Sequence, residues 1–172
     1  TLDNRGYVWK DKVYAQLIEE FDIQDYTVNF LLEDYIKHFK NHCIPFPNLI
    51  VMLRKLQKLG CSLGIISNGM TEFQLHNIRA LGIESYFQTI LISEKEELRK
   101  PDPLIFQKAL EQMKVSANES LFVGDHPEND VRASKKVGMT SVWKKDTYWD
   151  NIIADYTVDD LIEIINLVEE LR

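Results

Sequence analysis

The sequence predicts an α/β protein in which helices cover both faces of a parallel sheet. Two observations lead to this fold class. From about residue 46 onward, apolar runs of strand length alternate with amphipathic patterns that are each long enough for a short helix. Several of the runs are apolar throughout, as expected of strands buried on both faces. Alternation of this kind produces right-handed crossovers between neighbouring parallel strands.

The composition is that of a soluble globular protein. Its 172 residues are enough for one domain with a core and a small appendage. Apolar residues make up 45% of the chain, and its net charge of -7 disfavours binding to nucleic acid or to an anionic membrane surface. No apolar run approaches the roughly 20 residues that span a bilayer, and the first residues lack signal-peptide features. Cys43 and Cys61 form no disulfide framework, so we expect a cytoplasmic protein.

Two amphipathic helices are expected before the first strand. Apolar residues recur at helical spacing over residues 7–21 and again over 28–39, with no strand pattern before or between them. Residues 44–47, Ile-Pro-Phe-Pro, then mark a linker. We therefore place a boundary near residue 45, which separates a helical unit over 1–45 from an α/β unit over 46–172.

Glycine, threonine and proline punctuate the elements after this boundary. Gly60, Gly82 and Gly138 are each expected to end a helix, because glycine adopts the left-handed conformation that closes helices. Thr71 suits a helix N-cap, and Pro103 suits a first helical position. The expected elements are a helix over 49–59, a strand over 61–66, a helix over 72–81, a strand over 89–92, a charged loop over 93–102, a helix over 103–113, a strand over 121–123, a helix over 131–137, strands over 141–143 and 156–158, and a helix over 161–171.

Residues with chemical potential follow three of these strands. Because the carboxyl ends of parallel strands face the same side, the residues just after each strand share one cleft. The residues that follow the three strands are Ser67, Asn68 and Gly69, then the loop 95–102 with Lys100, and finally Asp125, His126, Asn129 and Asp130. A hydroxyl, a backbone turn, a lysine and acids form a set that suits a phosphate bound against a cation.

The first two groups are candidates for binding the phosphate. The Ser67 hydroxyl and the Asn68 and Gly69 amides can donate to phosphate oxygens, although Ser67 also suits a turn or a cap. Lys100 precedes Pro101, which restricts the backbone of the residue before it. A lysine held in this way can neutralise phosphoryl oxygens, whereas most lysines are solvated surface charges.

The third group is a candidate metal site. Asp125 can give a carboxylate oxygen to Mg²⁺, which prefers one or two carboxylates together with waters and substrate phosphate. Asp130 can complete the ligation directly, through water, or by orienting Lys100. The alternative is that both acids are turn and helix-cap residues. His126 and Asn129 are candidates for substrate contact, and a zinc site is not expected because His126 has no histidine partner at ligand spacing.

These motifs resemble motifs two, three and four of the haloacid dehalogenase-like (HAD) hydrolase superfamily. The residues that carry the resemblance are Ile-Ile-Ser-Asn-Gly at 65–69, Lys-Pro-Asp-Pro at 100–103, and Val-Gly-Asp at 123–125 followed by Asn129 and Asp130. They occur in the family's order, and the similarity covers about residues 45–172. The resemblance implies a three-layer, Rossmann-like parallel sheet core, with residues 1–45 as a small, all-helical remnant of a cap.

The resemblance also implies an activity. Enzymes of this type hydrolyse small phosphorylated metabolites with Mg²⁺ through an aspartyl-phosphate intermediate. On this view Ser67 and Lys100 are catalytic residues that bind the phosphoryl group, together with Asn68 and Gly69. Asp125 binds the metal, and Asp130 supports the metal and the lysine.

The sequence departs from the family at motif one. That motif, Asp-x-Asp, carries the nucleophile and the general acid/base, and no such pair is present. Thr1 and Leu2 can be read as its tail, but the cap would then have only two helices. We expect instead that the nucleophile lies upstream of Thr1 and that these residues alone are inactive. In the family, motif one follows a strand that lies between those ending at Ser67 and Asp125. Without that strand, two neighbouring strands would each expose an unpaired edge, which would favour self-association.

Three other functions compete with a phosphatase. A haloacid dehalogenase shares the serine, the lysine and the helical cap, but it needs no metal and usually lacks Gly-Asp at motif four, which is present here as Gly124-Asp125. A receiver-like phospho-binding module shares the doubly wound fold but has no helical cap. A non-catalytic HAD-like protein is the third alternative.

Overall fold

The computed structural model describes residues 2–4 and 8–172, and these form two compact units, 1–43 and 44–172. The expected boundary near residue 45 falls close to this division. Thr1, and the predicted beginning of the first helix at Tyr7, lie outside the described residues.

The first unit consists of two helices that pack against each other. Helix α1 spans Lys10–Glu20 and helix α2 spans Val28–His38, followed by the 3-10 turn η2 (Phe39–His42). The side chain of Thr27 caps α2 by accepting from the Phe30 backbone N–H at 3.2 Å. Tyr35 lies at the centre of the helix pair, with its ring 6.5 Å from Trp9, 6.4 Å from Tyr14 and 5.1 Å from Phe39, centroid to centroid. Aromatic packing therefore joins the two helices.

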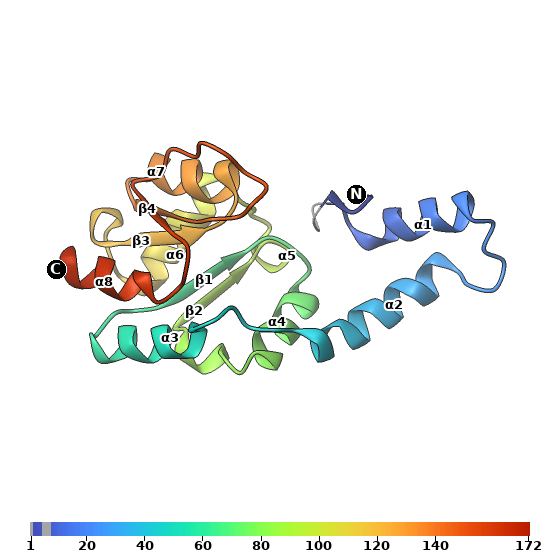
Figure 1. Ribbon diagram of the computed structural model, residues 1–172, viewed down its shortest axis with the longest axis horizontal. Helices are drawn as coiled ribbons and strands as arrows, with labels where there is room; N and C mark the ends of the chain where they lie inside the picture. Colours follow the sequence, from blue (N-terminus) through green and yellow to red (C-terminus); the bar gives the residue numbers. More distant parts are fainter. Residues whose placement is uncertain (1, 5–7) are drawn as a thin grey trace. The chain divides into compact units, whose positions relative to one another are not determined.

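The second unit contains five strands, all paired in parallel. They are β1 (Gly64–Ser67), β2 (Thr89–Ile92), β3 (Leu121–Gly124), β4 (Thr140–Lys144) and β5 (Tyr156–Val158). Strand β1 pairs with β2, and β3 pairs with β4 (Figure 1). Strand β5 pairs with the other edge of β4. The parallel α/β fold predicted from the sequence is confirmed.

Helices cover both faces of these strands. They are α3 (Leu49–Lys58), α4 (Thr71–Ala80), α5 (Ser93–Glu96), α6 (Pro103–Met113), α7 (Ala133–Lys136) and α8 (Glu163–Glu170), with the short turns η3 (Glu84–Tyr86) and η4 (Ala117–Glu119) and the π-helical turn η5 (Pro127–Arg132). Helices α3 and α8 bury Leu53 and Ile164 in one apolar cluster, whereas α6 and α7 bury Phe106 and Ala133 in another. The unit is a three-layer α/β/α structure.

The sheet is divided between β1 and β3. Both strands contribute to both apolar clusters, since Ile65 and Val123 belong to one and Ile66 and Phe122 to the other. Within the described residues, however, β1 is paired only with β2, and β3 only with β4. Each of the two strands therefore has one edge without a paired strand, at the place where the sequence led us to expect a further strand.

Apart from shifts of one or two residues at the ends of elements, four expectations differ from the structure. The strand predicted over 61–66 begins only at Gly64. The charged loop predicted over 93–102 begins with helix α5, and the helix predicted over 131–137 begins earlier, with η5. Thr71 is the first residue of α4 and not its cap. The Thr71 backbone N–H donates instead to Glu94 Oε2 at 2.8 Å, so the first turn of α4 is capped by a carboxylate from another helix. A cap from a distant part of the chain leaves no local sequence signal.

Asp155 connects the segment before β5 to β4 and α7. Its Oδ2 accepts from the Ser141 backbone N–H at 2.9 Å and from the Ser141 hydroxyl at 2.8 Å. The Lys135 ammonium lies 2.5 Å from Oδ1. The hydrogen bond from Lys135 is the main reason that the pKa of Asp155 falls from 3.8 to about 2, and the hydrogen bonds from Ser141 act in the same direction.

This arrangement predicts a pH-dependent contribution to stability. A carboxyl group with a lowered pKa stabilises the fold fully above its unfolded pKa of 3.8, and the contribution is lost as the pH falls toward 2. Because Asp155 is about one-third exposed, we expect Asp155→Asn to lower the free energy of unfolding at pH 7 by only about 1 kcal/mol. Urea unfolding at several pH values measures the difference, which should vanish near pH 2.

The matched control for this experiment is Asp159→Asn. This exposed residue pairs with Lys145 at 2.7 Å, and its loss should change the free energy of unfolding by less than about 0.5 kcal/mol. A deficit of Asp155→Asn that stayed constant down to pH 2 would contradict the assigned role of its charge.

Candidate active site

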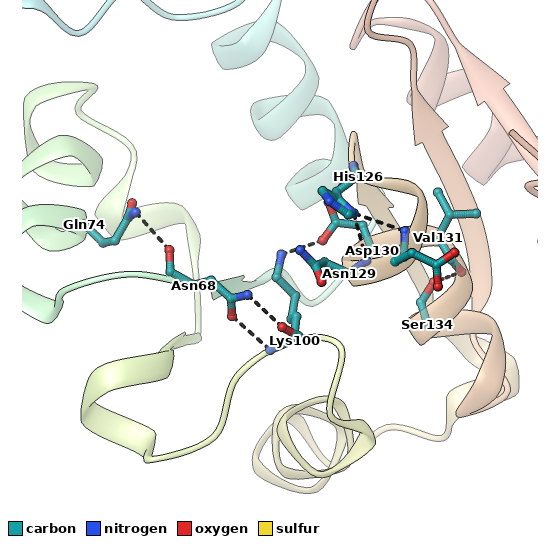
Figure 2. Close-up of polar contacts among 9 residues, drawn as sticks. Asn68, Gln74, Lys100, His126, Asn129, Asp130, Val131 and Ser134 are labelled. Atoms are coloured by element: carbon teal, nitrogen blue, oxygen red, sulfur yellow. Dashed lines mark hydrogen bonds and ion pairs between the residues drawn. The ribbon is translucent and has the colours of Figure 1, made fainter. Parts of the chain in front are cut away.

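The site is built first around the backbone of Lys100, which is fixed to the end of β1. Asn68, the residue after β1, pairs with both backbone groups of Lys100 (Figure 2). Asn68 Oδ1 accepts from the Lys100 N–H at 2.9 Å, and Asn68 Nδ2 donates to the Lys100 carbonyl at 2.8 Å. The backbone of Asn68 is itself held, because its carbonyl accepts from Gln74 Nε2 at 3.3 Å. The Lys100–Pro101 peptide bond is cis.

The side chain of Lys100 is fixed as well. Its Nζ lies 2.6 Å from Asp130 Oδ1 and 5.2 Å from the centroid of the Phe122 ring. The Lys100 side chain is 13% exposed and the Asp130 side chain 5% exposed, so the ion pair is largely removed from water. A buried pair of this kind needs good geometry to offset the loss of hydration, and the ring face adds a favourable contact with the cation.

Asp130 holds its position through both carboxylate oxygens. While Oδ1 faces Lys100, Oδ2 accepts from the backbone N–H of His126 at 3.0 Å. Asp130 also lies directly against β3, because a Cβ atom at Gly124 would stand 2.4 Å from the Cβ of Asp130. Only glycine leaves this space. Of the roles expected for Asp130, the engagement of both oxygens favours the orientation of Lys100.

His126 begins the η5 turn on which Asp130 lies. Its Nδ1 accepts from the backbone N–H groups of Glu128 and Asn129, each at 3.1 Å. The imidazole therefore acts as the N-cap of η5, and a neutral ring carries its proton on Nε2. The sequence predicts substrate contacts for His126 and Asn129. The capping role was not anticipated, and those contacts stay predictions.

Asp125 follows β3 immediately and lies at the same edge. The protein packed around its carboxyl group raises the pKa of Asp125, and the negative charge of Asp130 raises it further. The Lys100 ammonium acts in the opposite direction, so these three charged groups influence one another. The Asp125 carbonyl accepts from Trp143 Nε1 at 3.0 Å, which fixes the backbone at this position.

The surroundings of Asp125 suit a divalent cation. Asp125 is exposed to solvent, but the surrounding protein partly desolvates its carboxyl group, and a neighbouring acid also disfavours its charge, so it gains from a bound cation. In the part of the chain that the structure describes, no three His, Cys, Asp or Glu side chains form a group that could hold a metal. Mg²⁺ does not need such a group, because it accepts one or two carboxylates and completes its shell with water and phosphate oxygens. Asp125 therefore fits Mg²⁺ as a ligand.

The remaining predicted phosphate ligands lie at the end of β1. Ser67 is the last residue of the strand and is half-buried, opposite Ile92 of β2. The backbone N–H of Gly69 donates to Ser93 Oγ at 2.9 Å, so this amide already has a partner. Asn68 likewise uses its carboxamide on Lys100. The sequence placed these residues at one edge but did not reveal the pairing of Asn68 or the part played by Ser93, since both depend on long-range contacts.

Comparison with known proteins gives a consistent result. A family model described as haloacid dehalogenase-like hydrolase matches residues 8–144. A glyceraldehyde 3-phosphate phosphatase of Methanocaldococcus jannaschii is 33% identical over 74% of this chain and 58% of its own length. The structure of a HAD phosphatase from Thermococcus onnurineus is 29% identical, with a TM-score of 0.72 over 90% of this chain and 70% of that one.

A dehalogenase is also similar to this chain. The structure of a 2-haloacid dehalogenase from Pseudomonas syringae is 25% identical, with a TM-score of 0.70 over 95% of this chain and 71% of that one. The chain spans little more than half the length of the curated relatives it matches. Within residues 2–4 and 8–172, no helix is both long enough and apolar enough to cross a membrane.

The close approach of Gly124 to Asp130 predicts the effect of adding one methyl group. Gly124→Ala places its Cβ against the Asp130 side chain, and overpacking of this kind should cost about 1–3 kcal/mol of stability. The matched control is Gly64→Ala in β1, where the Cβ meets the flexible Met113 Sδ at 2.7 Å. Denaturant unfolding measures both variants. Equal losses would show that contact with Asp130 is not the constraint at Gly124.

Proposed function

This chain belongs to the haloacid dehalogenase-like hydrolase family, and we propose that it forms the phosphoryl-binding part of a Mg²⁺-dependent phosphatase. The observation that supports this proposal best is the Lys100 ammonium, held between Asn68 at the end of β1 and Asp130 after β3. A fixed cation beside a carboxylate suited to a metal is the arrangement that a transferring phosphoryl group requires. The substrate is a small phosphorylated metabolite.

Lys100 and Ser67 would bind the oxygens of the phosphoryl group. The ammonium retains two hydrogen atoms beyond the one directed at Asp130 Oδ1, and these can donate to phosphate. The Ser67 hydroxyl would donate from the end of β1. Asp130 would keep the ammonium oriented, so that little reorganisation is needed when charge develops on the oxygens.

Asp125 would hold the Mg²⁺ ion. A bound Mg²⁺ would supply charge neutralisation and orientation of the phosphoryl oxygens. Since both Asp130 oxygens have partners, we assign Asp130 to the positioning of Lys100, with its support of the metal passing through water. Asp125 is thus the protein ligand on which metal binding chiefly depends.

The nucleophile would be an aspartate on a strand that pairs between β1 and β3. This proposal rests on the unpaired edges of these two strands, which share both apolar clusters. Attack of that carboxylate forms a new O–P bond and breaks the ester O–P bond, while a general acid protonates the leaving oxygen. Water then hydrolyses the acyl phosphate. Two cysteines, Cys43 and Cys61, are too few for a disulfide framework, which favours a cytoplasmic location.

The helical unit over residues 1–43 would be part of the cap. It packs as a helix pair around Tyr35 and leaves Phe21 and Phe30 more than half exposed. Exposed aromatic residues on a small helical unit are suited to further helices of the cap or to substrate.

Substitution of Asp125 tests the assigned metal ligand. In the full-length protein, Asp125→Ala should lower Mg²⁺-dependent hydrolysis of p-nitrophenyl phosphate by about 100-fold or more, because the cation loses its protein ligand. Glu111→Gln, an exposed change on α6, is the control and should keep the wild-type rate. A near-wild-type rate for Asp125→Ala would remove Asp125 from the site. Turnover by residues 1–172 alone would contradict a nucleophile on another segment.

Metal removal distinguishes the phosphatase from a dehalogenase. The dehalogenase is kept as an alternative because the chain is similar to the Pseudomonas syringae enzyme. With the full-length protein, EDTA should abolish release of phosphate from a phosphate ester, and added Mg²⁺ should restore it. Release of halide from a 2-haloacid in the presence of EDTA would support a dehalogenase instead, since that chemistry needs no cation. Gly124-Asp125, which such dehalogenases usually lack, favours the first result.

A further inference from the structure

Three aromatic rings lie beside the candidate metal ligand. The His126 and Trp149 rings have centroids 5.2 Å apart, and those of Trp149 and Tyr148 are 5.0 Å apart with the planes nearly perpendicular. Tyr148 is 53% exposed. We call His126, Tyr148 and Trp149 the aromatic shelf. Its rings have no part in the phosphoryl-binding roles assigned above, apart from the cap that His126 provides to η5.

The backbone holds the shelf in place. Asp146 Oδ1 accepts from the Tyr148 N–H at 2.8 Å, and the Asp146 carbonyl accepts from the Trp149 N–H at 3.4 Å. His126 is fixed by the two N–H groups of η5 that donate to its Nδ1. Rings that are already ordered lose little conformational entropy when a ligand packs on them.

The shelf lies where the leaving group of a substrate would extend. His126 follows Asp125 directly, and the Asp125 carbonyl is bonded to Trp143 in β4. The chain leaves β4 at Lys144 and reaches Tyr148 and Trp149 within five residues. The backbone N–H of His126 donates to Asp130, the partner of Lys100, and the His126 ring contacts Trp149. An ester with its phosphate beside Lys100 would therefore have these rings as neighbours of its organic part.

Charge narrows the class of leaving group. Two acids belong to the segment that carries the rings: Asp146, whose Oδ1 accepts from the Tyr148 N–H at 2.8 Å, and the exposed Asp150, which follows Trp149. The two lysines that precede Asp146 already have partners, since Lys144 Nζ donates to the Lys145 carbonyl at 3.1 Å and Lys145 Nζ lies 2.7 Å from Asp159 Oδ2. A leaving group that carries a carboxylate would meet negative charge here, whereas a neutral ring would find apolar faces.

We infer that the aromatic shelf binds a neutral, planar ring in the leaving group of the substrate. This inference rests on the proposed phosphatase function and specifies its substrate class, namely phosphate monoesters whose leaving group carries an aromatic ring or a nucleobase. Stacking on Trp149 and Tyr148 supplies the specificity, and the phosphoryl site acts on any ester that it orients.

Substrate selectivity in the full-length protein tests the inference. The measurement compares kcat/KM for a nucleoside 5'-monophosphate with kcat/KM for glycerol phosphate. Wild type should favour the nucleotide, and Trp149→Leu should lower the selectivity ratio about tenfold, mainly through KM of the nucleotide, since one stacking contact is lost. Trp149→Phe should restore most of the ratio. Ile153→Ala, an exposed apolar change in the same loop, should leave it unchanged.

Binding provides a second measurement that does not depend on turnover. Nucleoside monophosphate should quench tryptophan fluorescence in the wild type at concentrations where inorganic phosphate does not, and Trp149→Leu should lose this effect. Equal losses of kcat/KM for both esters, or a wild type without preference for the ring, would overturn the inference. If the wild type hydrolyses neither ester but its tryptophan fluorescence is still quenched, the proposed phosphatase function is contradicted and ring binding by the aromatic shelf is supported. If the wild type shows neither a preference for the nucleotide nor quenching, the aromatic shelf is not a binding site.

Discussion

The buried ion pair between Lys100 and Asp130 constrains the rest of the site. A pair removed from water is stable only when each partner has further contacts that replace hydration. Lys100 has the Phe122 ring beneath its ammonium, and Asp130 has the His126 backbone N–H. The same ion pair explains why residue 124 is glycine, because any side chain there would occupy the space of Asp130. Gly124 at the end of β3 thus leaves room for the buried carboxylate of Asp130, and the next residue, Asp125, presents an exposed carboxylate.

The same residues connect two parts of the sheet that share no backbone pairing. Strands β1 and β2 form one part and β3, β4 and β5 the other. Asn68 after β1 fixes the backbone of Lys100, and the ammonium of Lys100 pairs with Asp130 after β3. A polar connection therefore crosses the division at the carboxyl edge, while the two apolar clusters cross it on the faces. The residues that make this connection are far apart in the sequence but lie together at the carboxyl edge of the strands.

Local sequence signals, such as short apolar runs and a proline at the first helical position, predicted several elements with correct limits. Strand β2, helix α6 with its first-turn Pro103, and strand β5 have the predicted limits. Two of the departures share a cause, which is a partner far away in sequence. Glu94 replaces Thr71 as the cap of α4, and Ser93 occupies the Gly69 amide. Pro101 indicated that Lys100 is held, but the residue that holds its backbone stands 32 positions earlier. Nothing in the local pattern around Lys100 identifies Asn68.

The Lys100 ammonium is paired with Asp130 and is also the proposed cation for phosphate, and this limits how tightly the site can hold an anion. Phosphate that arrives must share this cation with Asp130, whose carboxylate is buried and cannot turn to water for compensation. The Asp130 carboxylate competes with the ligand for the ammonium, so the attraction between Lys100 and a bound anion is weaker than it would be for an unpaired lysine. Under the proposed function, weak retention of phosphate would be an advantage, because release of the product often sets the turnover rate.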